Sequence, residues 1–170
     1  AGPRQTGPAF DAGRGLNVNT HDVAVKAQEF RINGFTVFEN LIAPDTIDQI
    51  REAWIPVRDA GIANQNDGVP LRGWGRYNVP VPYERPFLDE QIFEHPSLVA
   101  FLEEILGEAY VWFIFDSNIP LPGTDYQNWH RDGIYSLYPD IATPCYQVGV
   151  KFPLCDTSEK NGSFEGMPST

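Results

Sequence analysis

The chain has 170 residues, of which 42% are apolar, and carries a formal charge of −11. These figures predict one domain with a hydrophobic core, and the acidic charge argues against nucleic acid as a partner, because a polyanion would be repelled over most of the surface. Cys145 and Cys155 are the only cysteines, and no segment is apolar for long enough to span a bilayer, so we expect a soluble cytoplasmic protein without membrane contact.

The N-terminal twenty residues and the segment 61–86 lack helical or strand periodicity. Residues 1–20 are rich in Gly, Pro, Asn and Arg, which predicts a flexible arm. Residues 61–86 combine the same residue types with interleaved aromatic side chains. That mixture predicts either a loop over a pocket or a surface loop whose aromatic residues anchor it.

Three helices are predicted in the first 108 residues. Apolar side chains recur there at helical spacing, and prolines or capping residues mark the starts. Pro56 is expected to disrupt the second helix. The bounding residues of the three helices are Thr20 and Gly34, Pro44 and Gly61, and Pro96 and Gly107.

Strands are expected to dominate after the third helix. β-branched and aromatic residues gather in runs that Pro and Gly separate, which is typical of strands. The predicted strands are residues 35–38, 110–115, 126–132 and 146–154. The pattern therefore predicts a helical part over 21–108 and a β-rich part over 109–170.

His130 and Asp132 are the residues that indicate a metal site. In an extended strand, residues two apart point to the same face, so the imidazole and the carboxylate would converge. Non-haem Fe(II) oxygenases bind iron with two His and one carboxylate, which leaves positions open for a co-substrate and dioxygen. An ordinary hydrogen-bonded His–Asp pair is the alternative. Asn128 should share this face, whereas Trp129 should face the other layer as a core residue.

The residues around this pair carry a resemblance to a known family. Trp129-His130-Arg131-Asp132-Gly133 resembles the W-H-x-D-G segment of the phytanoyl-CoA dioxygenase family. Residues 150–170 are similar to that family's apolar strand, Asp-containing turn, N-G pair and terminal P-G-S/T-H phrase. Residues 34–38 and 95–107 also look like its early G-F strand and the helix before its barrel. The resemblance covers residues 23–170.

The resemblance implies a mainly β fold with N-terminal helices, namely a double-stranded β-helix of the jelly-roll or cupin-like kind. It implies Fe(II), 2-oxoglutarate and dioxygen, and hydroxylation of a small organic substrate. His130 and Asp132 would be the metal ligands and catalytic residues, and Gln127, Asn128 and Lys151 would contact the co-substrate. Lys151 stands where some members carry an aromatic residue, and would pair with a carboxylate or face solvent. Halogenating relatives replace the carboxylate ligand with Ala or Gly, so Asp132 favours hydroxylation.

The matched segment lacks two features that the family pattern places further on, a second His ligand and an Arg that binds 2-oxoglutarate. His21 and His95 both stand at predicted helix starts, where a capping or surface role is expected. We therefore expect the C-terminal part of the barrel to lie beyond Thr170 in a longer protein. The alternatives are a site that another chain completes and a truncated or inactive relative that only binds. A cupin-like metal protein of another class would instead carry further His residues near His130.

Overall fold

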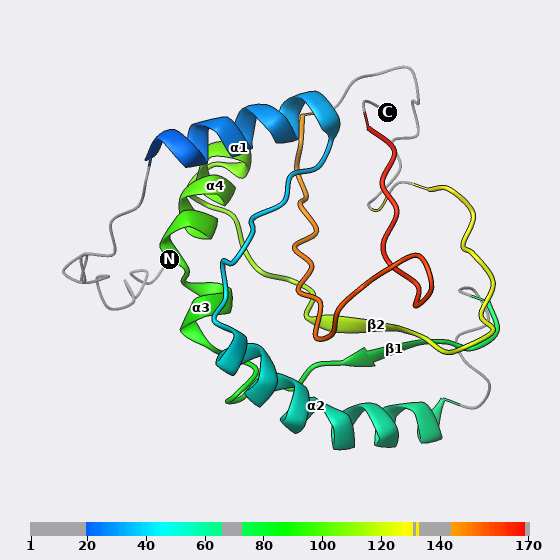
Figure 1. Ribbon diagram of the computed structural model, residues 1–170. Helices are drawn as coiled ribbons and strands as arrows, with labels where there is room; N and C mark the ends of the chain where they lie inside the picture. Colours follow the sequence, from blue (N-terminus) through cyan, green and yellow to red (C-terminus); the bar gives the residue numbers. More distant parts are fainter. Residues whose placement is uncertain (1–19, 66–72, 131, 133–143, 169–170) are drawn as a thin grey trace, which may run out of the picture.

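The computed structural model describes residues 20–65, 73–130, 132 and 144–168 (Figure 1). The predicted arm therefore lies outside the described residues except for its last residue, which begins a helix. The elements, in chain order, are α1 (Thr20–Asn33), α2 (Pro44–Asn64), β1 (Arg76–Pro80), α3 (Glu90–Phe93), α4 (Pro96–Leu106) and β2 (Asp116–Pro120).

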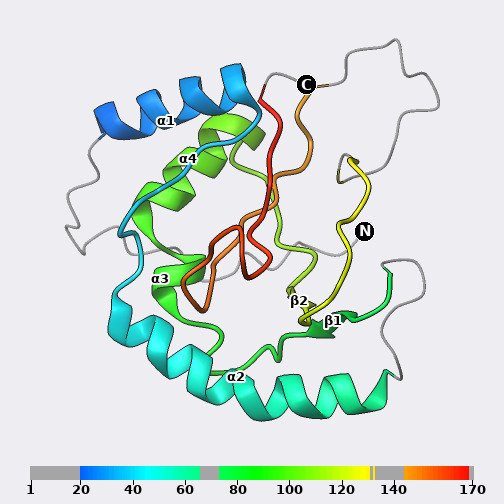
Figure 2. The same cartoon turned by 45° about the vertical axis from the view of Figure 1, so that its right-hand side comes forward.

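Helices α1 and α4 pack against each other, as both views show (Figures 1 and 2). Phe101 of α4 meets the rings of Phe30 and Phe38 edge-on, with centroids 5.6 and 5.3 Å apart. Gly34 ends α1 with φ near +81°, a conformation that favours glycine, and its N–H bonds the Phe30 carbonyl at 2.8 Å. Both predicted helices are confirmed. The buried residues of this α1/α4 cluster are Val23, Ala27, Leu98, Phe101 and Leu102.

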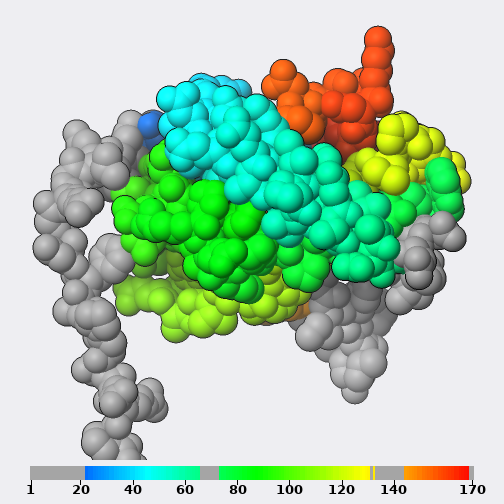
Figure 3. All heavy atoms as spheres, turned by 90° about the horizontal axis from the view of Figure 1, so that it is seen from below, coloured from blue at the N-terminus to red at the C-terminus, as the bar shows by residue number. Residues whose placement is uncertain are grey.

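Helix α2 begins at Pro44 as predicted but continues through Pro56 to Asn64. The prediction that Pro56 and Gly61 end it is wrong. A proline inside a helix removes one backbone hydrogen bond and costs about 3 kcal/mol. Burial of Ile50 and Trp54 on the same helix offsets that cost, because each large apolar side chain contributes roughly 1.5–3 kcal/mol when it leaves water. Figure 3 shows α2 lying across the face seen from below, beside the segment that carries α3.

Strands β1 and β2 form an antiparallel pair in which Tyr77 lies opposite Ile119 and Val79 opposite Ser117. Tyr77 and Val79 are buried and their neighbours are not, as the two-residue period of a strand requires. This strand lies within residues 61–86, so the prediction of a loop is wrong for residues 76–80. The buried residues of this sheet cluster are Ile50, Trp54, Tyr77, Val79, Phe87 and Ile92.

The four predicted strands are not paired strands in the structure. Within the described ranges, the sheet contains β1 and β2 only, and the described residues of 35–38, 110–115, 126–132 and 146–154 belong to no ladder. Side-chain type favours an extended backbone, but a strand also needs a neighbour that supplies hydrogen bonds, and composition does not specify one. The described architecture is therefore an α1/α4 pair and a two-stranded sheet against which α2 packs, a smaller β content than the predicted double-stranded β-helix.

Residues 146–154 nevertheless contribute to the core. Val148 and Val150 pack against the α1/α4 cluster, and Phe152 packs against both clusters. In Figure 1 this segment, drawn in orange, runs between the α1/α4 side and the red C-terminal residues. Among the described helices, none combines the length and the apolarity that crossing a membrane requires.

Candidate metal centre

The segment that carries His130 leaves β2 through a turn anchored to the start of β1. The hydroxyl of Thr124 donates to the Gly75 carbonyl at 3.1 Å, and the Arg76 guanidinium donates to the Asp125 carbonyl at 2.7 Å. Gly75 has φ near +71°, and a Cβ there would lie 2.7 Å from the Thr124 hydroxyl oxygen. A glycine is therefore required where the two segments meet. This junction fixes the point from which residues 126–130 depart.

His130 and Asp132 lie together at the end of this segment. Nε2 of His130 is 3.3 Å from Oδ1 of Asp132, and Nδ1 of His130 is 2.7 Å from the backbone carbonyl of Asn128. A carbonyl oxygen only accepts hydrogen bonds, so this contact requires a proton on Nδ1 and leaves Nε2 as the nitrogen that a metal ion would bind. That nitrogen faces the carboxylate. Both side chains are accessible, with 46% and 64% of their surface exposed.

The two donor atoms fit a divalent metal ion. Adjacent ligands about 2.1 Å from an octahedral ion lie about 3 Å apart, close to the observed Nε2–Oδ1 separation. Metal-binding histidines usually donate their other ring N–H to a carboxylate, a carbonyl or water, which matches the contact of His130 with Asn128. In the part of the chain that the structure describes, no group of three or more His, Cys, Asp or Glu residues gathers to hold an ion. His130 and Asp132 are thus a pair of candidate ligands and not a complete ligand set.

Lys151 meets the same carboxylate from the segment 146–154. Its Nζ lies 3.9 Å from Oδ2 of Asp132 and 4.7 Å from the ring centroid of Phe164. Of the two alternatives that the sequence left open, the structure shows the pairing with a carboxylate, although half of the Lys151 side chain remains exposed. Phe164 was not predicted, and no local sequence pattern signals a ring that packs on a lysine from a separate segment.

The other residues that the sequence analysis named near this pair differ in what the structure shows of them. Asn128 reaches His130 through its backbone carbonyl, and Gln127 is half-buried one residue earlier. Trp129 was predicted as a core residue, but 63% of it is exposed, because residues 126–130 are not part of a sheet with a second layer behind it. Arg131 and Gly133 lie outside the described residues.

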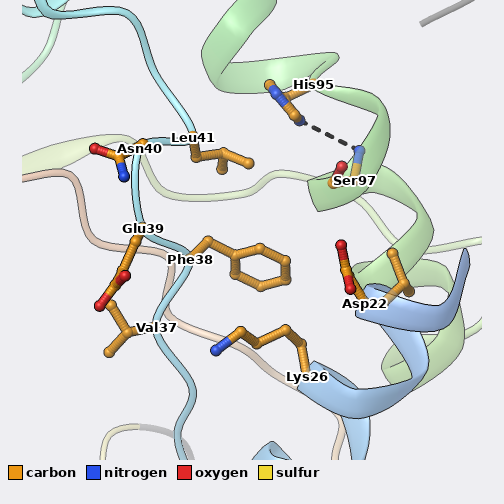
Figure 4. Close-up of a pocket in the computed structure, with 10 residues that line it drawn as sticks. Asp22, Lys26, Val37, Phe38, Glu39, Asn40, Leu41, His95 and Ser97 are labelled. Atoms are coloured by element: carbon orange, nitrogen blue, oxygen red, sulfur yellow. Dashed lines mark hydrogen bonds between the residues drawn. The ribbon is translucent and has the colours of Figure 1, made fainter. Parts of the chain in front are cut away.

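His95 caps α4, in agreement with the role expected from its position. Its Nδ1 accepts the backbone N–H of Ser97 at 3.2 Å, and partial burial lowers the pKa of the imidazole below its ordinary value. His95 and Ser97 border an open hollow of about 360 Å³ between α1, residues 37–41 and the start of α4 (Figure 4). None of the predicted site residues lines it. For His21, only the helical backbone belongs to the described structure.

The family model described as phytanoyl-CoA dioxygenase (PhyH) matches residues 30–170, which include His130, Asp132 and Lys151. No solved structure matches the chain.

Proposed function

Because the chain belongs to the phytanoyl-CoA dioxygenase (PhyH) family, we propose that it is a non-haem Fe(II)/2-oxoglutarate-dependent dioxygenase that hydroxylates a small organic substrate. Members of this family are usually oxygenases of that kind. The observation that carries the proposal is the approach of His130 Nε2 to Asp132 Oδ1 at 3.3 Å. One imidazole and one carboxylate are two of the three ligands of the facial triad that such enzymes use.

In this proposal His130 and Asp132 hold Fe(II), and the family's second His completes the ligand set. Iron and 2-oxoglutarate, when bound, would activate dioxygen and so supply the oxidising power that side chains lack. The chain's own residues would bind the metal ion and orient the groups around it. The Asn128 carbonyl keeps the proton on Nδ1, so Nε2 stays available to the metal, and Asp132 adds a negative charge that favours a cation. The side chains of Gln127 and Asn128 are proposed contacts of 2-oxoglutarate, whereas the ammonium of Lys151 lies near the Asp132 carboxylate.

We place the second His and the 2-oxoglutarate-binding Arg in further strands that complete a double-stranded β-helix. The exposed apolar side chains of residues 111–114 support this arrangement. Val111, Phe113 and Ile114 expose 76%, 64% and 57% of their surface, a costly arrangement for consecutive apolar residues unless another layer covers them. A sheet that continued over this segment would remove that apolar area from water.

The experiment is anaerobic reconstitution of the full-length protein with Fe(II) and 2-oxoglutarate, followed by exposure to oxygen. Succinate should form, and His130→Ala should abolish it, whereas the matched control His95→Asn should retain it because His95 lies at a helix start. Succinate formation by His130→Ala at the wild-type rate would refute the assignment. Metal binding without succinate would instead favour a catalytically inactive binding protein.

A further inference from the structure

We propose that Lys151, held in place by Phe164, is a positioning residue that orients the Asp132 carboxylate so that only Oδ1 is presented to the metal. The proposal rests on the proposed function, since it concerns the same metal centre. It assigns Lys151 a role toward the protein ligand rather than toward the co-substrate.

The two oxygens of Asp132 face different partners. Oδ1 lies 3.3 Å from Nε2 of His130, on the side where the ligand atoms converge. Oδ2 lies 3.9 Å from the ammonium of Lys151. A carboxylate with one oxygen directed to the imidazole and the other to a cation has a defined orientation. It is therefore prepared to bind an ion through one oxygen.

Phe164 limits the freedom of the lysine. Its ring centroid is 4.7 Å from the Lys151 ammonium, within the range of a cation–π contact. At an exposed site, the ion pair alone would be weak, because ordering a long side chain opposes it. The ring and the carboxylate together give the ammonium two favourable neighbours in one position. The Phe164 ring thus acts on Asp132 through Lys151.

Binding through one oxygen matters because a metal held by two His and one carboxylate must keep its other coordination positions open. If Asp132 bound through both oxygens, it would occupy a position that the co-substrate or dioxygen needs. Asp132 is 64% exposed, so little else in the described structure restricts its rotation. Loss of a group that orients a metal ligand typically weakens metal binding 10- to 100-fold. We expect an effect in this range when Lys151 is removed.

The experiment is a titration of the full-length protein with Co(II), a spectroscopic substitute for Fe(II), followed by its visible absorption. Lys151→Met should weaken binding by about 10- to 100-fold. Lys151→Arg should restore most of the affinity, and Phe164→Leu should give an intermediate loss. Lys160→Met is the matched control, since Lys160 is exposed on the following turn, and it should bind as the wild type does. Thermal melting of each variant checks that the fold is retained.

A second measurement tests whether Lys151 sets the orientation of the Asp132 carboxylate or only strengthens metal binding. The splitting between the two infrared carboxylate stretches is large when one oxygen binds a metal and small when both do. With Co(II) bound, the wild type should show the large splitting for labelled aspartate, and Lys151→Met should reduce it. If Lys151→Met and Phe164→Leu both bind Co(II) as tightly as the wild type, the proposal is overturned. A defect confined to 2-oxoglutarate affinity would also overturn it and assign Lys151 to the co-substrate.

The two proposals fail in different ways. If the wild-type full-length protein does not bind Co(II), both the metal centre and the role of Lys151 are refuted. If the wild type binds Co(II) and Lys151→Met binds it equally well, the proposed function stands and the role of Lys151 does not.

Discussion

Gly61 of α2 lies against Val79 of β1 so closely that a Cβ on the glycine would be 2.5 Å from one methyl carbon of the valine and 2.6 Å from the other. Alanine in a helix interior normally stabilises by about 0.5–1 kcal/mol relative to glycine. Here the overlap should cost about 1–3 kcal/mol, so the clash outweighs the helix preference. We predict that Gly61→Ala lowers the free energy of unfolding, as measured by urea denaturation.

A double-mutant cycle with Val79→Ala tests this explanation. Val79→Ala removes both methyl carbons that the new Cβ would meet, so Gly61→Ala should cost less in that background. Equal costs in the two backgrounds would show that the loss comes from another source.

Phe101 should be among the most sensitive positions of the α1/α4 cluster. It is 3% exposed and contacts two other rings, so Phe101→Ala should reduce the free energy of unfolding by about 3–5 kcal/mol. Val25→Ala is the control at a half-exposed apolar position of α1 and should change it by less than about 0.5 kcal/mol. Similar urea midpoints for the two variants would contradict the placement of this core.

His95 should make stability depend on pH. Burial lowers its pKa in the folded state below the ordinary value of 6.5, so the unfolded chain binds more protons as the pH falls. The contribution is fully present above pH 6.5 and is lost as the pH drops below it. Protonation of Nδ1 also removes the acceptor of the Ser97 N–H. The change in urea midpoint between about pH 7.5 and 5.5 reports this loss.

His95→Asn provides the comparison. Asparagine is a good N-cap and does not titrate, so the variant should lose the part of the pH dependence that belongs to the histidine. If the change in urea midpoint between the two pH values is the same in His95→Asn as in the wild type, groups other than His95 cause that change. Hydrogen bonds from Thr36 and Lys26 lower the pKa of Glu29, so the stabilisation that its carboxylate provides is lost only at more acidic pH. Glu29 is present in both the wild type and His95→Asn and does not affect the comparison.

Asn128→Ala should leave metal affinity nearly unchanged, within about twofold. The contact that sets the His130 tautomer comes from the backbone carbonyl, which alanine retains. The amide side chain, in contrast, is a proposed contact of 2-oxoglutarate. Parallel titrations with Co(II) and with 2-oxoglutarate measure the two effects separately, and a large loss of Co(II) affinity would contradict the backbone role.

The helices were predictable because their signals are local. Pro44 and Pro96 start α2 and α4, and Gly34 and Gly107 follow α1 and α4, as their types suggest. The end of α2 was mispredicted because packing on the sheet cluster outweighs the local effect of Pro56. β1 was missed because its short alternation lies within a segment rich in Gly and Pro.

Strands after α4 could not be predicted reliably, because a local pattern does not show which segment pairs with which. Residues 110–115 have the composition of a buried strand, yet Val111 is 76% exposed and the segment is not assigned to the sheet. Its last residue, Phe115, accepts a backbone hydrogen bond from the Val81 N–H at 3.1 Å. The contact of His130 with Asp132 follows from their spacing, whereas Lys151 and Phe164 reach the site from separate segments. Their meeting depends on tertiary structure, and their roles, like the cytoplasmic location, stay predictions.

The exposure of Trp129 gives the site an optical probe. Its backbone is bonded directly to that of His130, so the indole and the imidazole proposed to bind the metal are attached to Cα atoms about 3.8 Å apart. Ions with partly filled d shells, such as Fe(II) and Co(II), quench the fluorescence of a nearby indole, whereas Zn(II), with a filled shell, does not. Trp54 is buried in the sheet cluster and provides an internal reference, and Trp129→Phe should remove the response. Occupancy of the site can therefore be followed by emission, without a label.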